Sequence, residues 1–189
     1  MVALIVGLGN PGEQYVKTRH NAGFLFVESL LSEIGEVFSY ASKFKADAAR
    51  FQHNGKIVHV LKPQTYMNKS GYSVAAYARY YDINVEEILV AHDELDLQPG
   101  VIRIKKSGGH GGHNGLRDII NHLSSPNFYR MRIGVGHPGD RRQVVNYVLD
   151  APSKHDKAQI SQAVLDGLGV MGDVFRAEYQ QAMQCLHTK

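Results

Sequence analysis

Apolar residues recur along the chain in two kinds of pattern: short runs or alternations, and longer stripes with helical spacing. The first kind predicts strands, because a buried strand is apolar throughout and a strand with unlike faces alternates. Six segments fit it: residues 3–6, 45–51, 56–61, 87–92, 101–105 and 128–136. The dipeptide Asn54-Gly55, between the second and third segments, is typical of a hairpin turn.

Stripes with helical spacing follow several of these strands. They predict helices at about residues 69–81 and 116–123, and a short helix that carries Arg141 and Arg142. A helix beginning after Asn21 has as its stripe Phe24, Val27, Leu30, Leu31 and Ile34. One long helix after Pro152-Ser153 has as its stripe Ile160, Val164, Leu168, Met171 and Phe175. Because strands and helices alternate, we predict a single α/β domain over residues 1–189, with a mostly parallel or mixed sheet.

Composition narrows the class of protein. Hydrophobic residues make up 43% and charged residues 21% of the 189 positions, as in an ordinary globular domain. No apolar run is long enough to span a bilayer, and the start lacks the basic region of a signal peptide. A single cysteine, Cys185, excludes an internal disulfide. We therefore expect a cytoplasmic protein with no membrane partner. The net charge of +3 says little by itself about an anionic partner.

Two glycine-rich segments lie next to predicted strands. Residues 7–12 (GLGNPG) match the dinucleotide-binding pattern G-x-G-x-x-G, but Pro11-Gly12 is turn chemistry and the helical pattern begins only after Asn21. We therefore expect no dinucleotide site. Residues 107–115 (SGGHGGHNG) link a predicted strand to a predicted helix, with Asn114 at the expected N-cap. Such crossovers hold ligands in α/β proteins, so we expect a functional loop rather than a flexible linker.

Seven polar residues gather at predicted strand ends and helix starts, and a common sheet edge would bring them together. They are Asn10, His20, Asn21, Asn68, Asp93, His113 and Asn114. Helix capping explains a lone asparagine, and Asn21, Asn68 and Asn114 all fall where an N-cap is expected. Capping does not explain why all seven occupy equivalent ends of successive elements.

Three chemical schemes compete for these residues. Nucleophilic catalysis is disfavoured, because Cys185 is remote and no G-x-S-x-G motif is present. Metal-dependent hydrolysis remains an alternative that draws on five residues, although glycines separate the His-x-x-His pair. These five are His92, Asp93, Asp96, His110 and His113. General-base hydrolysis needs a histidine, an orienting carboxylate and amide donors, which His20, Asp93 and the asparagines provide.

Basic residues follow two of the predicted strands. Arg103 and Lys105 share a face of one strand, and Arg130 and Arg132 share a face of another. Positive charge beside a hydrolytic site suggests a phosphate-bearing substrate, whereas a sheet edge protected by Lys and Arg is the structural alternative.

Six segments, in order along the chain, resemble bacterial peptidyl-tRNA hydrolase. They are residues 7–12 (GLGNPG), 18–23 (TRHNAG), 63–71 (PQTYMNKSG), 92–96 (HDELD), 108–115 (GGHGGHNG) and 132–138 (RIGVGHP). The resemblance extends from Gly7 to about Ser153, and the chain length also fits. It implies a twisted, mixed and largely parallel sheet with helices on both faces.

The resemblance also implies an activity: a monomeric, metal-independent and cofactor-free esterase that cleaves the bond between a peptide and the 3′-terminal ribose of tRNA. His20 would be the general base and Asp93 would orient it, while Asn10, Asn68 and Asn114 would position the ester, the water and the oxyanion. Binding of the peptidyl-tRNA, including its acceptor stem, 3′ CCA end and 5′-phosphate, would involve nine residues. They are Tyr15, Asn21, Tyr66, Met67, Arg103, Lys105, His113, Arg132 and Arg141.

The resemblance assigns two segments by position: a mobile lid at about residues 138–151 and a C-terminal helical part at residues 153–185. Lys106-Ser107 departs from the family's pattern, in which further glycine is frequent, and is a candidate for one more phosphate contact. From a different class of function, a non-catalytic module that binds the acceptor end of tRNA would use the same polar groups only for hydrogen bonding.

Overall fold

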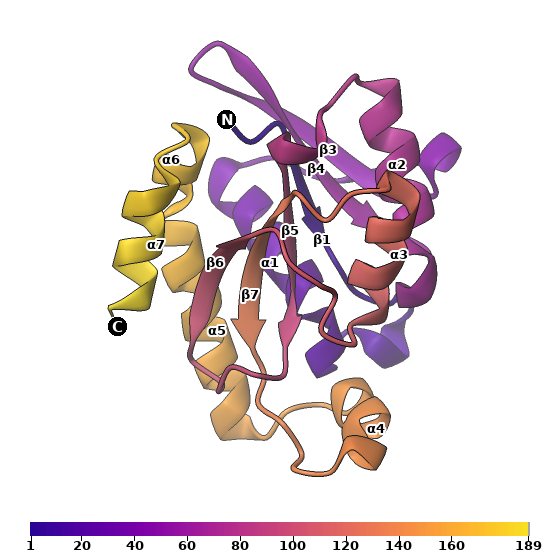
Figure 1. Cartoon of the computed structure of the whole chain (residues 1–189), viewed down its shortest axis with the longest axis vertical. Coiled ribbons are helices and arrows are strands. Elements are labelled where there is room, and N and C mark those ends of the chain that lie inside the picture. Colours follow the sequence, from indigo (N-terminus) through magenta and orange to yellow (C-terminus); the bar gives the residue numbers. More distant parts are fainter. Residues whose placement is uncertain (189) are drawn as a thin grey trace.

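A seven-stranded mixed sheet forms the centre of the protein in the computed structural model, which describes residues 1–188 (Figure 1). The strand order is β2-β3-β4-β1-β5-β7-β6. The strands are β1 (Leu4–Gly7), β2 (Ser39–Ala41), β3 (Ala46–His53), β4 (Lys56–Pro63), β5 (Ile88–Glu94), β6 (Ile102–Lys106) and β7 (Tyr129–Gly134). The central strands β4, β1, β5 and β7 are parallel, whereas the edge strands are antiparallel to their neighbours.

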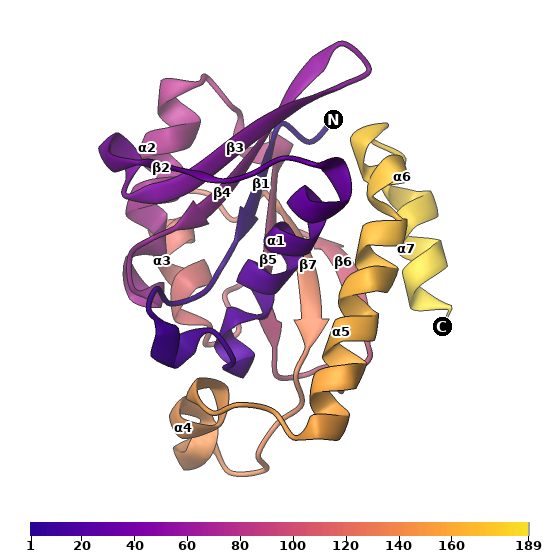
Figure 2. The ribbon, with the colours of Figure 1, turned by 180° about the vertical axis from the view of Figure 1, so that it is seen from behind.

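Helices cover both faces of the sheet (Figures 1 and 2). They are α1 (Ala22–Ile34), α2 (Ser70–Tyr80), α3 (Asn114–Leu123), α4 (Val144–Leu149), α5 (Lys154–Gly169), α6 (Met171–Phe175) and α7 (Tyr179–His187). One apolar cluster joins the sheet to α1, α5, α6 and α7, and a second joins its other face to α2 and α3. The predicted fold class is therefore confirmed. The predicted domain range includes Lys189, which lies outside the described residues.

The predicted strands and most helices are confirmed, with three corrections. The C-terminal stripe is divided between two helices, because α5 ends at Gly169 and α6 begins at Met171. The predicted helical part also includes α7, which follows Ala177 in a left-handed conformation (φ 64°). Ile34 is 37% exposed at the last residue of α1, beyond the buried stripe. Two of the predicted caps are wrong: Lys69 precedes α2, and His113 rather than Asn114 caps α3.

The parallel strands end at one edge of the sheet, where the polar residues were predicted to meet. Strand β6 runs the other way, and its last residue, Lys106, pairs with the first residue of β7, Tyr129. The glycine-rich loop therefore begins at the opposite edge and runs back to the start of α3. No dinucleotide-type helix follows the glycines of residues 7–12, because α1 begins only at Ala22.

Among residues 1–188, no helix combines the length and the apolar character that crossing a membrane requires.

Candidate active site

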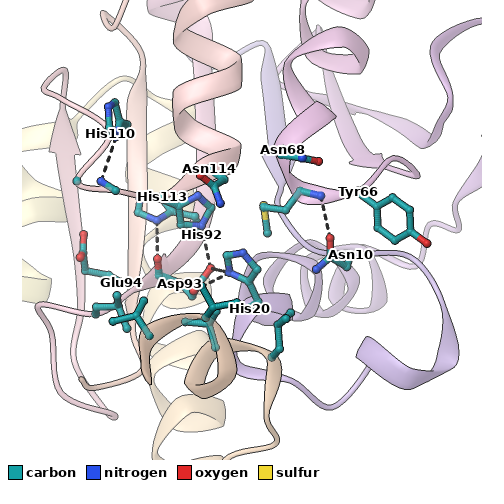
Figure 3. A pocket seen from close by; sticks show the side chains of 18 of the residues that line it. Asn10, His20, Tyr66, Asn68, His92, Asp93, Glu94, His110, His113 and Asn114 are labelled. Atoms are coloured by element: carbon teal, nitrogen blue, oxygen red, sulfur yellow. Dashed lines mark hydrogen bonds and ion pairs between the residues drawn. The ribbon is translucent and has the colours of Figure 1, made fainter. Parts of the chain in front are cut away.

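A cavity of about 520 Å³ opens at the carboxyl ends of the parallel strands, beside α4 (Figure 3). Eight of the predicted site residues line it: Asn10, His20, Tyr66, Met67, Asn68, Asp93, His113 and Asn114. They come from the loop after β1, the short helix before α1, the segment after β4, the end of β5 and the start of α3. Six of the seven polar residues that were expected to converge at this edge therefore line one cavity, and Asn21 does not.

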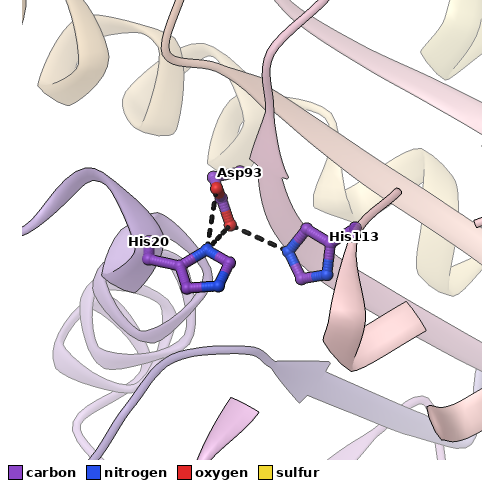
Figure 4. A group of neighbouring side chains, drawn as sticks. All are labelled: His20, Asp93 and His113. Carbon is purple, nitrogen blue, oxygen red and sulfur yellow. Dashed lines mark hydrogen bonds and ion pairs between the residues drawn. The ribbon is translucent and has the colours of Figure 1, made fainter. Parts of the chain in front are cut away.

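His20 and Asp93 form the polar centre of this cavity (Figure 4). His20 lies in the 3₁₀ helix Arg19–Asn21, and its Nδ1 is 2.9 Å from both carboxylate oxygens of Asp93. Because a carboxylate only accepts hydrogen bonds, the neutral ring carries its proton on Nδ1 and leaves Nε2 with a free lone pair. That tautomer is the one a general base needs, with the base atom on the side of the ring away from the carboxylate.

His113 contacts the same carboxylate from α3. Its Nε2 is 2.9 Å from Asp93 Oδ1, and its Nδ1 accepts the backbone N–H of Leu116 at 3.3 Å, which caps the helix. Since Nδ1 is an acceptor, the proton of the neutral ring is on Nε2 and is donated to Asp93. The rings of His20 and His113 are 5.0 Å apart between centroids. The carboxylate of Asp93 thus orients two imidazoles.

Burial and charge act in opposite directions on the pKa values of this group. Burial raises the pKa of Asp93, but His20 and His113 outweigh it through charge and hydrogen bonds and hold that pKa well below its usual range. Burial lowers the pKa of His20, but the charge of Asp93 and the hydrogen bond to it leave the pKa above 6.5. The structure therefore favours an ionised Asp93 that stabilises the imidazolium form of His20.

His92 lies beneath His113 and is almost completely buried. Its Nδ1 donates to the backbone oxygen of Asp93 at 2.8 Å. Burial, followed by the charge of His113, lowers the pKa of His92 to about 3. His92 therefore remains neutral at ordinary pH and supports the end of β5 that carries Asp93.

The four predicted asparagines differ in their contacts. Asn10 is buried and accepts the backbone N–H of Met67 at 2.8 Å, so it fixes the floor of the cavity. Asn21 lies below the cavity and exchanges two hydrogen bonds with the backbone of Asn10, at 2.9 and 3.0 Å. Asn68 and Asn114 line the cavity with exposed amide groups, which suits groups that contact a ligand.

His20, Asp93 and His113 also form a candidate metal cluster, with their ligand atoms within 4.8 Å of one another. In the neutral tautomers, however, Nδ1 of His20 and Nε2 of His113 both carry protons and donate them to Asp93. A cation could bind here only if both nitrogens lost those protons. The hydrogen bonds therefore fit proton transfer better than metal coordination. His92 is held by Asp93 O, and Asp96 does not line the cavity, so neither supports the five-residue metal set.

The four predicted basic side chains of β6 and β7 lie outside the cavity, where Arg103 pairs with Arg132 and Lys105 with Arg130 across the ladder. Arg130 is 3% exposed and donates to the carbonyl oxygens of Gly108 and Gly109, so it holds the glycine-rich loop. Burial, more than the charge of Arg132, lowers the pKa of Arg130.

Arg132 and Lys106, two other basic residues of β6 and β7, have different partners from Arg130. Arg132 donates from Nε to Glu94 Oε2 at 2.8 Å, and Glu94 lines the cavity. The ammonium of Lys106 lies 5.5 Å above the Tyr129 ring. Tyr129 stacks on Tyr179 of α7, so Lys106 is on the face of the sheet away from Lys105.

Tyr15 and Arg141 also lie outside the cavity. Tyr15 contacts the edge of Tyr66, with 6.5 Å between the ring centroids, and Arg141 lies in the 3₁₀ helix Arg141–Gln143 before α4.

The apolar wall of the cavity was not predicted from the sequence. It is formed by Leu95 after β5 and by four residues of α4, namely Val144, Val145, Val148 and Leu149. Their spacing puts the four on one side of a short helix, and Val145 is 64% exposed. The sequence signal that could have identified this wall is the apolar side of the short helix, which no other predicted element was expected to cover. The remaining residues that line the cavity are Lys69, Glu94, Gly111 and Gly112, together with His92 and His110, which were candidates only in the metal-dependent alternative.

An α/β fold with a histidine–carboxylate pair in a cavity at its strand ends fits one class of protein, the hydrolases that activate water by general-base catalysis. A sequence model of the family "Peptidyl-tRNA hydrolase" matches residues 4–189. A peptidyl-tRNA hydrolase from Nitrosomonas europaea is 52% identical over 100% of this chain and 96% of the relative, and one from Pseudomonas entomophila is 51% identical over 98% and 96%.

A solved structure agrees with these relatives. The crystal structure of peptidyl-tRNA hydrolase from Acinetobacter baumannii is 46% identical, covers 98% of this chain and 94% of its own, and gives a TM-score of 0.95. The chain belongs to the peptidyl-tRNA hydrolase family, and it is an enzyme with a hydrolytic role.

Proposed function

We propose that the enzyme hydrolyses the ester bond between a peptide, or an N-blocked amino acid, and the 3′-terminal ribose of tRNA, with His20 as the general base. The hydrogen bonds of His20 Nδ1 to both oxygens of Asp93 carry the proposal, because they leave Nε2 free to accept a proton. Family membership and the names of the relatives support the choice of substrate.

In the proposed reaction, Nε2 of His20 takes a proton from water as the water oxygen attacks the ester carbonyl carbon. The imidazolium is stabilised by Asp93, and the carbonyl oxygen becomes an oxyanion that accepts a hydrogen bond from an asparagine amide. The bond from the carbonyl carbon to the ribose oxygen then breaks. The ribose oxygen takes the proton from His20, which releases tRNA with a free 3′-hydroxyl group and a peptide carboxylic acid.

The amides of Asn68 and Asn114 are the proposed donors to the ester and the oxyanion, since both are exposed in the cavity. Asn10 acts through Met67, whose backbone it holds. Tyr66 and Tyr15 form an aromatic pair beside the cavity that suits stacking with the bases of the 3′ CCA end. Asn21 supports this floor from below.

Basic residues outside the cavity are the proposed contacts to tRNA phosphates. Lys105 is exposed on the ladder of β6 and β7, beside Arg103 and Arg132, and is the proposed partner of the 5′-phosphate. Arg141 stands at the start of residues 138–151, the proposed lid near the acceptor stem. Replacing Lys105 with Ala should lower the affinity for 5′-phosphorylated tRNA and should have less effect on tRNA with a 5′-hydroxyl group. Equal losses with both tRNAs would contradict a 5′-phosphate contact.

We also propose that the enzyme works as a cytoplasmic monomer, because one chain forms the whole cavity. Light scattering coupled to size-exclusion chromatography measures the mass directly. A dimer mass at assay concentration would refute this part.

The deciding experiment measures peptide release from N-acetylaminoacyl-tRNA by the wild type and by His20→Asn, each with and without EDTA. We expect turnover that resists EDTA and is lost in His20→Asn, with tRNA binding retained. His155→Asn, an exposed histidine of α5, is the matched control.

Two results would point to other functions. Loss of turnover with EDTA would indicate a metal at His20, Asp93 and His113, as in a metal-dependent amidohydrolase. Binding of tRNA without turnover by the wild type would indicate a non-catalytic acceptor-end module.

A further inference from the structure

Arg19 precedes His20 and is a buried arginine, with 8% of its surface exposed. A guanidinium remains charged in a protein, so its burial is costly unless hydrogen bonds replace water. The proposed chemistry makes no use of this side chain. Its partners therefore indicate what it does.

Those partners belong to the end of α4. Nη1 of Arg19 donates to the backbone oxygens of Tyr147 at 3.2 Å, Asp150 at 3.3 Å and Ala151 at 3.2 Å. The backbone N–H of Arg19 also donates to the oxygen of Asp150, at 3.2 Å. Because the last carbonyl groups of a helix lack helical partners and carry partial negative charge, a cation is favoured at this position.

Two further contacts fix the plane of the guanidinium. Its central carbon lies 4.0 Å from the centre of the Tyr147 ring, and Nη2 is 3.8 Å from Asp156 Oδ2 in the first turn of α5. Tyr147 itself donates through its hydroxyl group to the backbone oxygen of Val135, at 2.7 Å. The side chain of Arg19 thus joins α4, the start of α5 and the segment that carries His20.

The position of α4 matters because this helix is the apolar wall of the cavity. It has six residues and lies beyond the strand ends, apart from the two helical layers (Figure 1). A helix this short is not stable by itself, so its place depends on tertiary contacts. Arg19 provides several of them and is adjacent in sequence to the proposed base.

We infer that Arg19 is a positioning residue that holds α4 at a fixed distance from His20 and thereby determines how tightly the apolar side chain of the ester-linked amino acid is bound. A substrate with a large apolar side chain contacts the wall, whereas one with glycine at this position does not. The kinetic part of the inference rests on the proposed function, and the structural part does not.

The kinetic test compares N-acetylphenylalanyl-tRNA with N-acetylglycyl-tRNA in the wild type, Arg19→Ala and Arg19→Lys. We expect Arg19→Ala to lose about tenfold in kcat/KM for the phenylalanyl substrate, mainly through KM, and much less for the glycyl substrate. The pH midpoint of kcat should not move, because Arg19 is not among the groups that shift the pKa of His20. Equal losses with both substrates would overturn the inference, since a purely structural role lowers the amount of active enzyme for every substrate.

The structural test is hydrogen–deuterium exchange, which needs no turnover. We expect exchange in residues 144–151 to become about tenfold faster in Arg19→Ala, with residues 22–34 unchanged. Arg176→Ala is the matched control, since Arg176 pairs with Asp173 and Glu178 near α6, away from the cavity. Unchanged exchange in residues 144–151 would overturn the inference.

Two variants guard against misfolding and against failure of the proposed function. Tyr147→Leu removes the ring that faces the guanidinium and leaves the segment around His20 intact, so it should shift the ratio between substrates in the same direction. If the ratio between the two substrates is unchanged in both Arg19→Lys and Tyr147→Leu, the inference is overturned. If the wild type hydrolyses neither substrate, the proposed function fails, and the exchange measurement alone decides the role of Arg19.

Discussion

Replacing Asp93 with Asn tests the central hydrogen bonds of the site. The amide oxygen can still accept a hydrogen bond, but its NH₂ group would meet the proton on Nδ1 of His20, which is 2.9 Å from both carboxylate oxygens. The ring relieves this conflict by moving its proton to Nε2, where it can no longer accept one from water. The negative charge that stabilises the imidazolium is lost as well.

The size of the effect follows from that charge. Two unit charges about 4 Å apart attract by about 4 kcal/mol at an effective dielectric constant of about 20. Since about 1.4 kcal/mol corresponds to tenfold in rate, the loss of charge alone predicts a fall of about 10³ in kcat. The change of tautomer adds to this fall.

The pH dependence of the rate gives a second test of the pairing between His20 and Asp93. The charge of Asp93 keeps the pKa of His20 above 6.5 against the effect of burial, so activity in the wild type should rise with pH through a midpoint above 6.5. In Asp93→Asn only burial remains, and the midpoint should fall below 6.5 although the plateau is lower.

The assay is kcat against pH from 5 to 9 on N-acetylaminoacyl-tRNA, with Asp96→Asn as the control for an exposed carboxylate three residues away. Asp96→Asn should keep the wild-type midpoint. A plateau in Asp93→Asn within tenfold of the wild type, or a midpoint that stays or rises, would refute the proposed pairing.

Three further predictions concern stability and the cavity floor. Because the pKa of His92 is lowered from 6.5 to about 3, the unfolded chain takes up this proton first, and stability is lost as pH falls below 6.5. Urea unfolding should show that this group lowers the free energy of unfolding by about 2 kcal/mol between pH 7.5 and 5. If the free energy of unfolding of His92→Asn depends on pH as strongly as that of the wild type, His92 is not the group responsible. Gly23→Ala should destabilise by at least about 2 kcal/mol, because its Cβ would overlap backbone atoms of Ala91 and Leu8, whereas Gly109→Ala, with open space around it, should change the unfolding midpoint little. Gly115→Ala places a Cβ 2.6 Å from Met67 Sδ, and since that side chain can move into the cavity, KM should rise with little change in thermal unfolding; a large loss of stability would contradict this.

The parts of the fold with strong local patterns could be predicted from the sequence. Buried strands such as β1 read as continuous apolar runs, and the hairpin of β3 and β4 has Asn54 and Gly55 both at positive φ, 48° and 76°. The reversed direction of β6 could not be predicted, because the alternation in residues 101–105 is the same in both directions. The turn from α6 into α7 could not be predicted either, because it depends on tertiary packing that brings α7 against β6.

The candidate site was predictable where residue type and position agreed. His20 and Asp93 were found because one precedes a predicted helix and the other follows a predicted strand at the same edge, and the structure shows that they meet. The role of Asn21 was harder, since helix position suggested a cap and the side chain instead bonds the backbone of Asn10. The division of the basic residues between the loop and the surface depends on side-chain direction, so Arg130 could not be distinguished from Arg132.

The ring of His113 makes two structural hydrogen bonds. Its Nδ1 caps the N-terminus of α3, and its Nε2 donates to Asp93. Asn or Asp at this position could still begin the helix, but their shorter side chains would not also reach the carboxylate. Exchange for Asn or Asp therefore removes the contact with Asp93, and exchange for a residue that cannot cap the helix alters local folding as well. Kinetic defects of His113 variants should be assigned to chemistry only after the helix has been shown to remain intact.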